Sequence, residues 1–155
     1  MKFKFLSLLA VASIATACTN DPTEKKTAPD QLIGTWTLFS ATTVEKGKST
    51  HIDFTKDQRM IKIINDSHFA FLRHDLKLNK EGNNNFDAGG GRYTLVGDQY
   101  TEFLDYYKDK NWEGKTFKFT IKIQNDTLIQ TGIEKVEAAG VDRTITERYV
   151  KEKTN

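Results

Sequence analysis

Hydrophobic and polar positions alternate along most of the chain after Leu32, which is the pattern of strands that bury one face. The clearest case is residues 117–123, where Phe and Ile at odd positions alternate with Lys and Thr at even ones. No stretch shows a helical period. The pattern predicts eight strands, at residues 34–44, 59–64, 68–74, 91–96, 99–107, 115–124, 127–133 and 142–150. The polar segment 45–58 is expected to be a long connection, with at most a short turn of helix.

Turn residues between these runs predict the hairpins and their registers. Residues 125–126 (Asn-Asp) and 97–98 (Gly-Asp) each suit a two-residue turn. The resulting cross-strand pairs are Gln124 with Thr127, Ile123 with Leu128, Val96 with Gln99, Leu95 with Tyr100, and Tyr93 with Glu102. At 65–67 a three-residue loop is expected, because it places Ile63 opposite Phe69 with both side chains turned inward.

Eight consecutive, hairpin-linked strands predict an all-β fold, an eight-stranded up-and-down antiparallel barrel. Closure of the barrel leaves no exposed sheet edge. A β-sandwich is the alternative architecture. Eight strands enclose an interior that is either filled by side chains or holds one small ligand. The barrel domain is expected to span residues 32–155.

The N-terminus has the features of an export signal, which is removed in the mature protein. Lys2 and Lys4 precede a short apolar run at 5–14, and Ala-Thr-Ala-Cys follows. This ending resembles a bacterial lipobox, so residues 1–17 are predicted to be a lipoprotein signal peptide and Cys18 the site of lipidation by fatty acyl chains such as palmitate. Residues 18–31 would then form a lipidated cysteine and a flexible tether.

This processing changes the expected chemistry. Cleavage before Cys18 removes two lysines and brings the formal net charge from +2 to zero, so no nucleic-acid partner is expected. Cys18 is the only cysteine, so lipidation would leave no thiol for a disulfide or a nucleophile. The expected location is the cell envelope, anchored in a membrane by the N-terminal lipid. Thr19 favours the outer membrane, facing the periplasm or the cell surface.

A family resemblance is carried by Gly34 and Trp36, a Gly-x-Trp at the start of the first strand in LIGTWTL. It continues through FKFTIKIQNDTLIQTG and the closing ITERYVK. Residues 32–151 resemble the lipocalin-like domain of small secreted bacterial lipoproteins of largely unassigned function. The resemblance implies that a late basic residue, Lys151 or Arg148, packs across Trp36 near the closed end of the barrel.

Three consecutive glycines at 89–91 raise the question of a phosphate-binding loop. Their spacing matches neither a Walker loop nor a dinucleotide-binding loop, and a strand rather than a helix follows them. The segment DKNWEGKT at 109–116 lacks the first glycine of a Walker loop. The glycines are therefore predicted to be a flexible lead-in to a strand at the barrel mouth.

The hairpin registers predict an aromatic interior with a few polar groups, which is the composition of a ligand pocket. Arg143 and tyrosine hydroxyls are the expected partners of the buried carboxylates. The residues predicted to line the interior and bind ligand are Trp36, Tyr93, Tyr100, Glu102, Tyr106, Gln130, Arg143, Glu147 and Tyr149. The alternative is that the carboxylates of Glu102 and Glu147 form a structural network without any ligand.

The remaining polar residues form no recognisable catalytic or metal site. His51, His68 and His74 are scattered, and the last two are expected to point outward. No catalytic residue, metal or cofactor is predicted, and the chain is not expected to be an enzyme. A hydrolase with paired carboxylates is the low-ranked alternative.

These patterns lead to two hypotheses. In the first, a monomeric lipoprotein of the cell envelope binds a small, largely apolar ligand in its barrel. In the second, the barrel is a filled scaffold that acts through its surface as an inhibitor or an envelope assembly partner.

Overall fold

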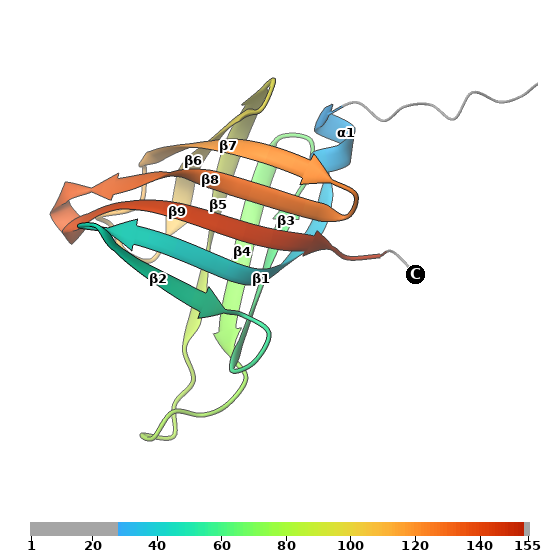
Figure 1. Cartoon of the computed structure of the whole chain (residues 1–155). Helices are drawn as coiled ribbons and strands as arrows, with labels where there is room; N and C mark the ends of the chain where they lie inside the picture. Colours follow the sequence, from blue (N-terminus) through green and yellow to red (C-terminus); the bar gives the residue numbers. More distant parts are fainter. Residues whose placement is uncertain (1–27, 154–155) are drawn as a thin grey trace, which may run out of the picture.

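The computed structural model describes residues 28–153, which form one continuous antiparallel sheet rolled into a barrel (Figure 1). The elements are α1 (Ala28–Leu32), β1 (Gly34–Glu45), β2 (Lys48–Asp53), β3 (Gln58–Ile64), β4 (His68–Asp75), β5 (Phe86–Val96), β6 (Gln99–Tyr107), β7 (Thr116–Gln124), β8 (Thr127–Val136), the 3-10 turn η1 (Glu137–Ala139) and β9 (Val141–Lys151). Helix α1 starts within the predicted tether.

The barrel closes through β1, which pairs with strands on both of its edges. One edge pairs with β9, and the other pairs with β3 through residues 34–37. The strands β1 and β3 to β9 therefore form a closed ring of eight, and every neighbouring pair is antiparallel. The predicted up-and-down barrel is confirmed. The β-sandwich alternative does not apply.

Strand β2 was not predicted. It occupies part of the expected connection 45–58 and pairs with β1 alone, from Glu45 opposite Lys48 to Ser40 opposite Asp53. A tight turn at Lys46 and Gly47, both with positive φ, folds it back. All six of its residues are exposed, so the strand has no buried face and shows no alternation of apolar and polar residues.

The predicted pairs of the β5–β6 and β7–β8 hairpins are confirmed, but the β3–β4 register is wrong by one residue. Ile64, not Ile63, lies opposite Phe69. The side chain of Asn65 explains the shift, because it accepts hydrogen bonds from the backbone N–H groups of Ser67 and His68 and tightens the turn. The observed register turns Ile63 outward, where it is 42% exposed.

The three glycines lie inside β5, so the predicted flexible lead-in is also wrong. Gly90 and Gly91 are buried between β4 and β6. A Cβ atom on Gly91 would lie 1.8 Å from the carbonyl oxygen of Phe103, and one on Gly90 would lie 2.5 Å from that of Phe69. Glycine is required here because neighbouring backbone occupies the space of a side chain.

A β-bulge on β6 accompanies this close approach. Gly90 pairs with Tyr106 but Arg92 pairs with Phe103, so β6 holds one extra residue. The extra residue reverses the alternation of inward and outward side chains. Tyr107 therefore points into the barrel, and Tyr106 points out.

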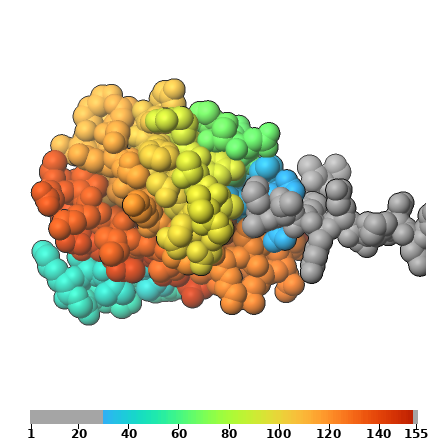
Figure 2. Space-filling view, turned by 90° about the horizontal axis from the view of Figure 1, so that it is seen from above, coloured from blue at the N-terminus to red at the C-terminus, as the bar shows by residue number. Residues whose placement is uncertain are grey.

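Helix α1 lies at one end of the molecule and the β1–β2 hairpin lies at the opposite end (Figure 2). At the α1 end, the side chains of Leu32 and Trp36 are fully buried. The Trp36 indole N–H donates to the carbonyl oxygen of Leu32 at 2.7 Å, which fixes the helix against the start of β1. Within residues 28–153, α1 is too short to cross a membrane, and no other helix is long and apolar enough to do so.

Candidate functional site: a cavity at the open end of the barrel

The barrel contains a cavity of about 340 Å³. Its lining comes from the halves of the strands that lie away from α1: the end of β1 and β6, and the beginning of β3, β7 and β9. The cavity therefore occupies the end opposite the helix. Its volume lies at the lower end of the range, roughly 300–1,000 Å³, that small-molecule pockets occupy.

One wall of the cavity is aromatic. Four rings follow one another at centroid distances of 6.0 Å (Phe71 to Tyr107), 6.3 Å (Tyr107 to Trp112) and 5.8 Å (Trp112 to Phe117). The Tyr107 hydroxyl donates to Asp87 at 3.0 Å. Burial and this bond to a carboxylate raise the pKa of Tyr107 to about 12, so its hydroxyl stays protonated.

The floor of the cavity holds a buried lysine. The side chain of Lys62 is 3% exposed, and its ammonium group donates to Glu102 Oε1 at 2.8 Å and to Gln130 Oε1 at 3.0 Å. Burial alone would lower the pKa of Lys62, but the negative charges of Glu102 and Glu147 outweigh it, so the pKa is raised and the amine is charged.

Three aromatic rings surround the Lys62 ammonium group. Its Nζ lies 5.2 Å from the ring centroid of Tyr149, 5.8 Å from that of Phe69 and 6.0 Å from that of Tyr100. Such cation–π contacts offset part of the cost of removing the charge from water. The Tyr100 hydroxyl is buried and has no hydrogen-bond partner of normal geometry among the described residues.

Glu147 lies beside this network on β9. It accepts a hydrogen bond at Oε2 from the Tyr149 hydroxyl at 2.8 Å. Burial raises the pKa of its carboxyl group, although the Lys62 charge and the Tyr149 bond act in the opposite direction. Burial likewise raises the pKa of Tyr149 well above its usual value.

Arg143 does not serve the two buried carboxylates as predicted. Its guanidinium group binds Glu134 Oε2, with Nε and Nη2 both at 2.6 Å. Glu134 lies directly opposite Arg143 in the β8–β9 pair, so the ion pair is a cross-strand contact. Glu102 is instead paired with Lys62.

The predicted interior residues divide into three groups. Those that line the cavity are Glu102, Gln130, Arg143 and Glu147. Those that lie in the closed half, outside the cavity lining, are Trp36, Tyr93, Tyr100 and Tyr149. The prediction that Tyr106 lines the interior is wrong. Its side chain is 70% exposed on the outer wall, because the β6 bulge reverses the alternation there. Whether any of these residues binds a ligand stays a prediction.

At the closed end, the basic residue across Trp36 is Lys151 rather than Arg148. The Lys151 ammonium group lies 5.0 Å from the Trp36 ring centroid and donates to the carbonyl oxygen of Gln31 at 2.8 Å. Lys151 thus links α1 to the tryptophan and seals this end of the barrel. Tyr93 also belongs to this end, since its hydroxyl donates to the backbone of Asn65.

Sequence reasoning missed several lining residues. Lys62 was missed because the assumed β3–β4 register turned Ile61 and Ile63 inward in its place. Phe71 lies two residues after Phe69, so the same alternation turned it inward, but it was not included among the predicted ligand-binding residues. Trp112 lies in the β6–β7 loop, where no periodic pattern marks it, and it packs on Phe117. Only the asparagine at the turn, a residue that favours tight turns, could have signalled the correct β3 register.

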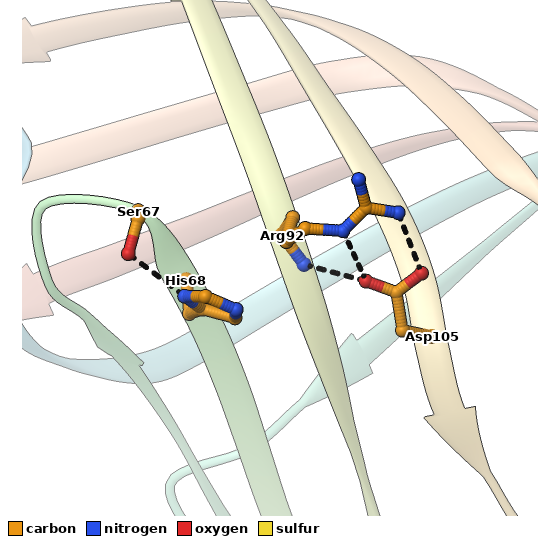
Figure 3. Close-up of polar contacts among 4 residues, drawn as sticks. All are labelled: Ser67, His68, Arg92 and Asp105. Atoms are coloured by element: carbon orange, nitrogen blue, oxygen red, sulfur yellow. Dashed lines mark hydrogen bonds and ion pairs between the residues drawn. The ribbon is translucent and has the colours of Figure 1, made fainter.

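The outer wall carries a serine, a histidine and an aspartate that do not form a catalytic triad (Figure 3). The Ser67 hydroxyl lies 2.8 Å from His68 Nδ1. Asp105 is held instead by Arg92, at 2.9 Å from Nε and 3.1 Å from Nη2. Across the part of the chain that the structure describes, no three His, Cys, Asp or Glu side chains are grouped to hold a metal ion.

Comparisons with known proteins find similarity at the level of structure alone. No family model matches the chain, and no curated protein matches it significantly. A lipocalin-like protein from Bacteroides uniformis aligns with a TM-score of 0.46 at 19% identity, over 79% of this chain and 99% of the other. An uncharacterized protein from Bacteroides eggerthii aligns with a TM-score of 0.46 at 13% identity, over 77% of this chain and 98% of the other. At these values the likeness says nothing about a ligand, and the barrel assignment rests on the strand pairing of this chain.

Proposed function

We propose that this chain binds one small, largely apolar molecule in the open half of its barrel and acts by binding rather than by catalysis. The observation that carries the proposal is the cavity of about 340 Å³ with an aromatic wall and a polar floor. Pockets for small molecules combine these two features: apolar area supplies affinity, and a few polar groups set orientation.

The polar floor supports binding because its side chains hold one another in place. Lys62, Glu102 and Gln130 hold one another by hydrogen bonds, so they need no rearrangement to present a fixed surface. A fixed site loses less conformational entropy when a ligand binds. A filled scaffold, the alternative hypothesis, needs an interior packed with side chains, and the cavity disfavours it.

We also propose that the barrel is anchored in the cell envelope by a lipid on Cys18. The support is the sequence pattern of residues 1–18, which lie outside the described residues. In this proposal the domain is a membrane-attached carrier or receptor for its ligand. Mass spectrometry of the mature N-terminus tests the anchor independently of the cavity.

A matched pair of phenylalanine substitutions tests the cavity. Thr43 lines it, whereas Thr144 is exposed on the outer face of the neighbouring strand. Thr43→Phe fills the cavity, and Thr144→Phe adds the same group outside. In calorimetric titration with naphthylethanol, a neutral apolar probe, the full chain and Thr144→Phe should bind with equal affinity, and Thr43→Phe should bind at least about tenfold more weakly. Equal binding by both variants would overturn the proposal.

A further inference from the structure

The acids that line the cavity differ in their partners. Glu102 is paired with Lys62, Glu134 with Arg143, and Asp87 with Lys108 at 3.1 Å. Glu147 forms no ion pair with any base among residues 28–153. Its Oε2 accepts the Tyr149 hydroxyl, and its Oε1 accepts no hydrogen bond from the described residues.

None of the basic side chains that line the cavity forms the ion pair that Glu147 lacks. Lys62 is occupied by two acceptors, and Arg143 lies on Glu134. Arg73 belongs to the open rim, where its guanidinium group lies 5.9 Å from the ring centroid of Phe54. A half-buried carboxylate that forms no ion pair is less stable in its charged form than a carboxylate in water, and a cation that reaches it stabilises that charge.

An anionic ligand does not suit this floor. Two of the three Lys62 N–H groups already donate to Glu102 and Gln130, and three aromatic rings surround the ammonium group, so an anion would have only the remaining N–H and would lie beside the Glu102 carboxylate. Its charge would also be repelled by Glu147. A cationic group, in contrast, gains a partner and leaves the existing ion pairs intact.

We propose that the ligand is a small amphiphilic amine whose ammonium group binds Glu147 and whose apolar part packs on the aromatic wall of Phe71, Tyr107, Trp112 and Phe117. This inference rests on the proposed function, that the cavity binds an apolar molecule, and it adds the chemistry of the ligand's polar group. Glu147 is the residue that selects for the amine, through a charge-assisted hydrogen bond.

The proposal predicts a pH dependence with a defined sign. The charged and titratable groups that act on Glu147 are Lys62 from β3, Glu102 from β6, Glu134 from β8 and Tyr149 on its own strand. Burial raises the pKa of the Glu147 carboxyl group, whereas a bound ammonium group would lower it. Amine affinity therefore falls as the pH is lowered through the raised pKa of Glu147, and near that pKa amine binding releases a proton.

Three isosteric probes test the selection in the full chain: naphthylethylamine, naphthylethanol and naphthylacetate. Calorimetry at neutral pH should show the amine binding about tenfold or more tightly than the alcohol, and the acid binding most weakly. Glu147→Gln keeps the shape and the Tyr149 contact but removes the charge, and should abolish the preference for the amine. Glu152→Gln, an exposed site at the closed end, is the matched control and should keep it.

The outcomes separate this inference from the proposed function. If all three probes bind equally, or if Glu147→Gln keeps the amine preference, the inference is wrong while cavity binding stands. If no probe binds, the proposed function fails as well. Should Glu147→Gln not fold, the pH dependence of binding to the unsubstituted chain decides: amine affinity should fall relative to alcohol affinity as the pH is lowered, and a constant ratio of the two affinities would overturn the inference.

Discussion

Lys62 stands among isoleucines in the sequence, yet its ammonium group is buried against Glu102 and Gln130. A buried ion pair adds little net stability, because desolvation of both ions offsets their attraction. Breaking it by removing one ion is costly, since the other ion is left buried alone. The pair therefore fixes the arrangement of the cavity floor more than it stabilises the barrel.

The first prediction concerns this pair. Lys62→Met should lower the free energy of unfolding by about 3–5 kcal/mol, because Glu102 loses its counter-ion. The double variant Lys62→Met/Glu102→Gln should regain a large part of that loss, since it buries no unpaired charge. Urea unfolding at neutral pH measures both. Additive losses in the double variant would show that the two residues do not act as a pair.

The second prediction concerns Glu147 and pH. Its pKa is raised in the folded barrel above the ordinary value of 4.5, so the folded state binds its proton more tightly than the unfolded chain does. The resulting stabilisation is fully present below pH 4.5 and is lost as the pH rises through the raised pKa. Glu147→Gln should remove this part of the pH dependence of the unfolding free energy. An unchanged difference between the two proteins from pH 4 to neutral would contradict it.

At the scale of elements, β5 departs most from its expected form. A run of three glycines is typical of a flexible loop, but here it forms the part of a strand where backbone from β4 and β6 comes closest. The β6 bulge lies at the same place, and because of it Tyr107 rather than Tyr106 lines the cavity. The glycines thus act on the site indirectly, by setting which tyrosine faces inward.

The third prediction follows from this crowding. Gly91→Ala should destabilise the barrel by about 3 kcal/mol or more, because its Cβ would collide with the Phe103 carbonyl group. Gly97→Ala is the control: Gly97 has open space around it but φ of +63°, so the cost should be about 1 kcal/mol. Thermal unfolding compares the two, and equal effects would contradict the proposed role of the backbone contact.

The elements that the sequence predicted correctly are the strands with one buried face and one exposed face. In β7, buried Phe117, Phe119 and Ile121 alternate with exposed lysine and threonine, and both the strand and its register with β8 were confirmed. Besides β5, two elements were predicted wrongly, and both failures have physical causes. β2 is exposed on both faces, and β3 carries a lysine inside and an isoleucine outside, so neither follows the usual pattern.

For the whole molecule, the closed barrel was predictable because eight hairpin-linked strands leave few other ways to pair both edges. The cavity was not, since an eight-stranded barrel can be filled or empty and the difference depends on which side chains point inward. Four predicted residues do line the cavity, all on strands where the alternation of inward and outward side chains was predicted correctly. Trp112 required three-dimensional information, and Lys62 could have been found only by using Asn65 to set the β3–β4 register.

The most direct test of the central claim is native mass spectrometry of the full chain, purified without denaturation from its native cells. A barrel that binds a small molecule should carry one such molecule per chain, extractable by organic solvent, and Thr43→Phe should lose it while Thr144→Phe keeps it. A ligand-free chain that also takes up none of the naphthyl probes, or equal occupancy in both variants, would contradict the claim that the open half of the barrel is a ligand site.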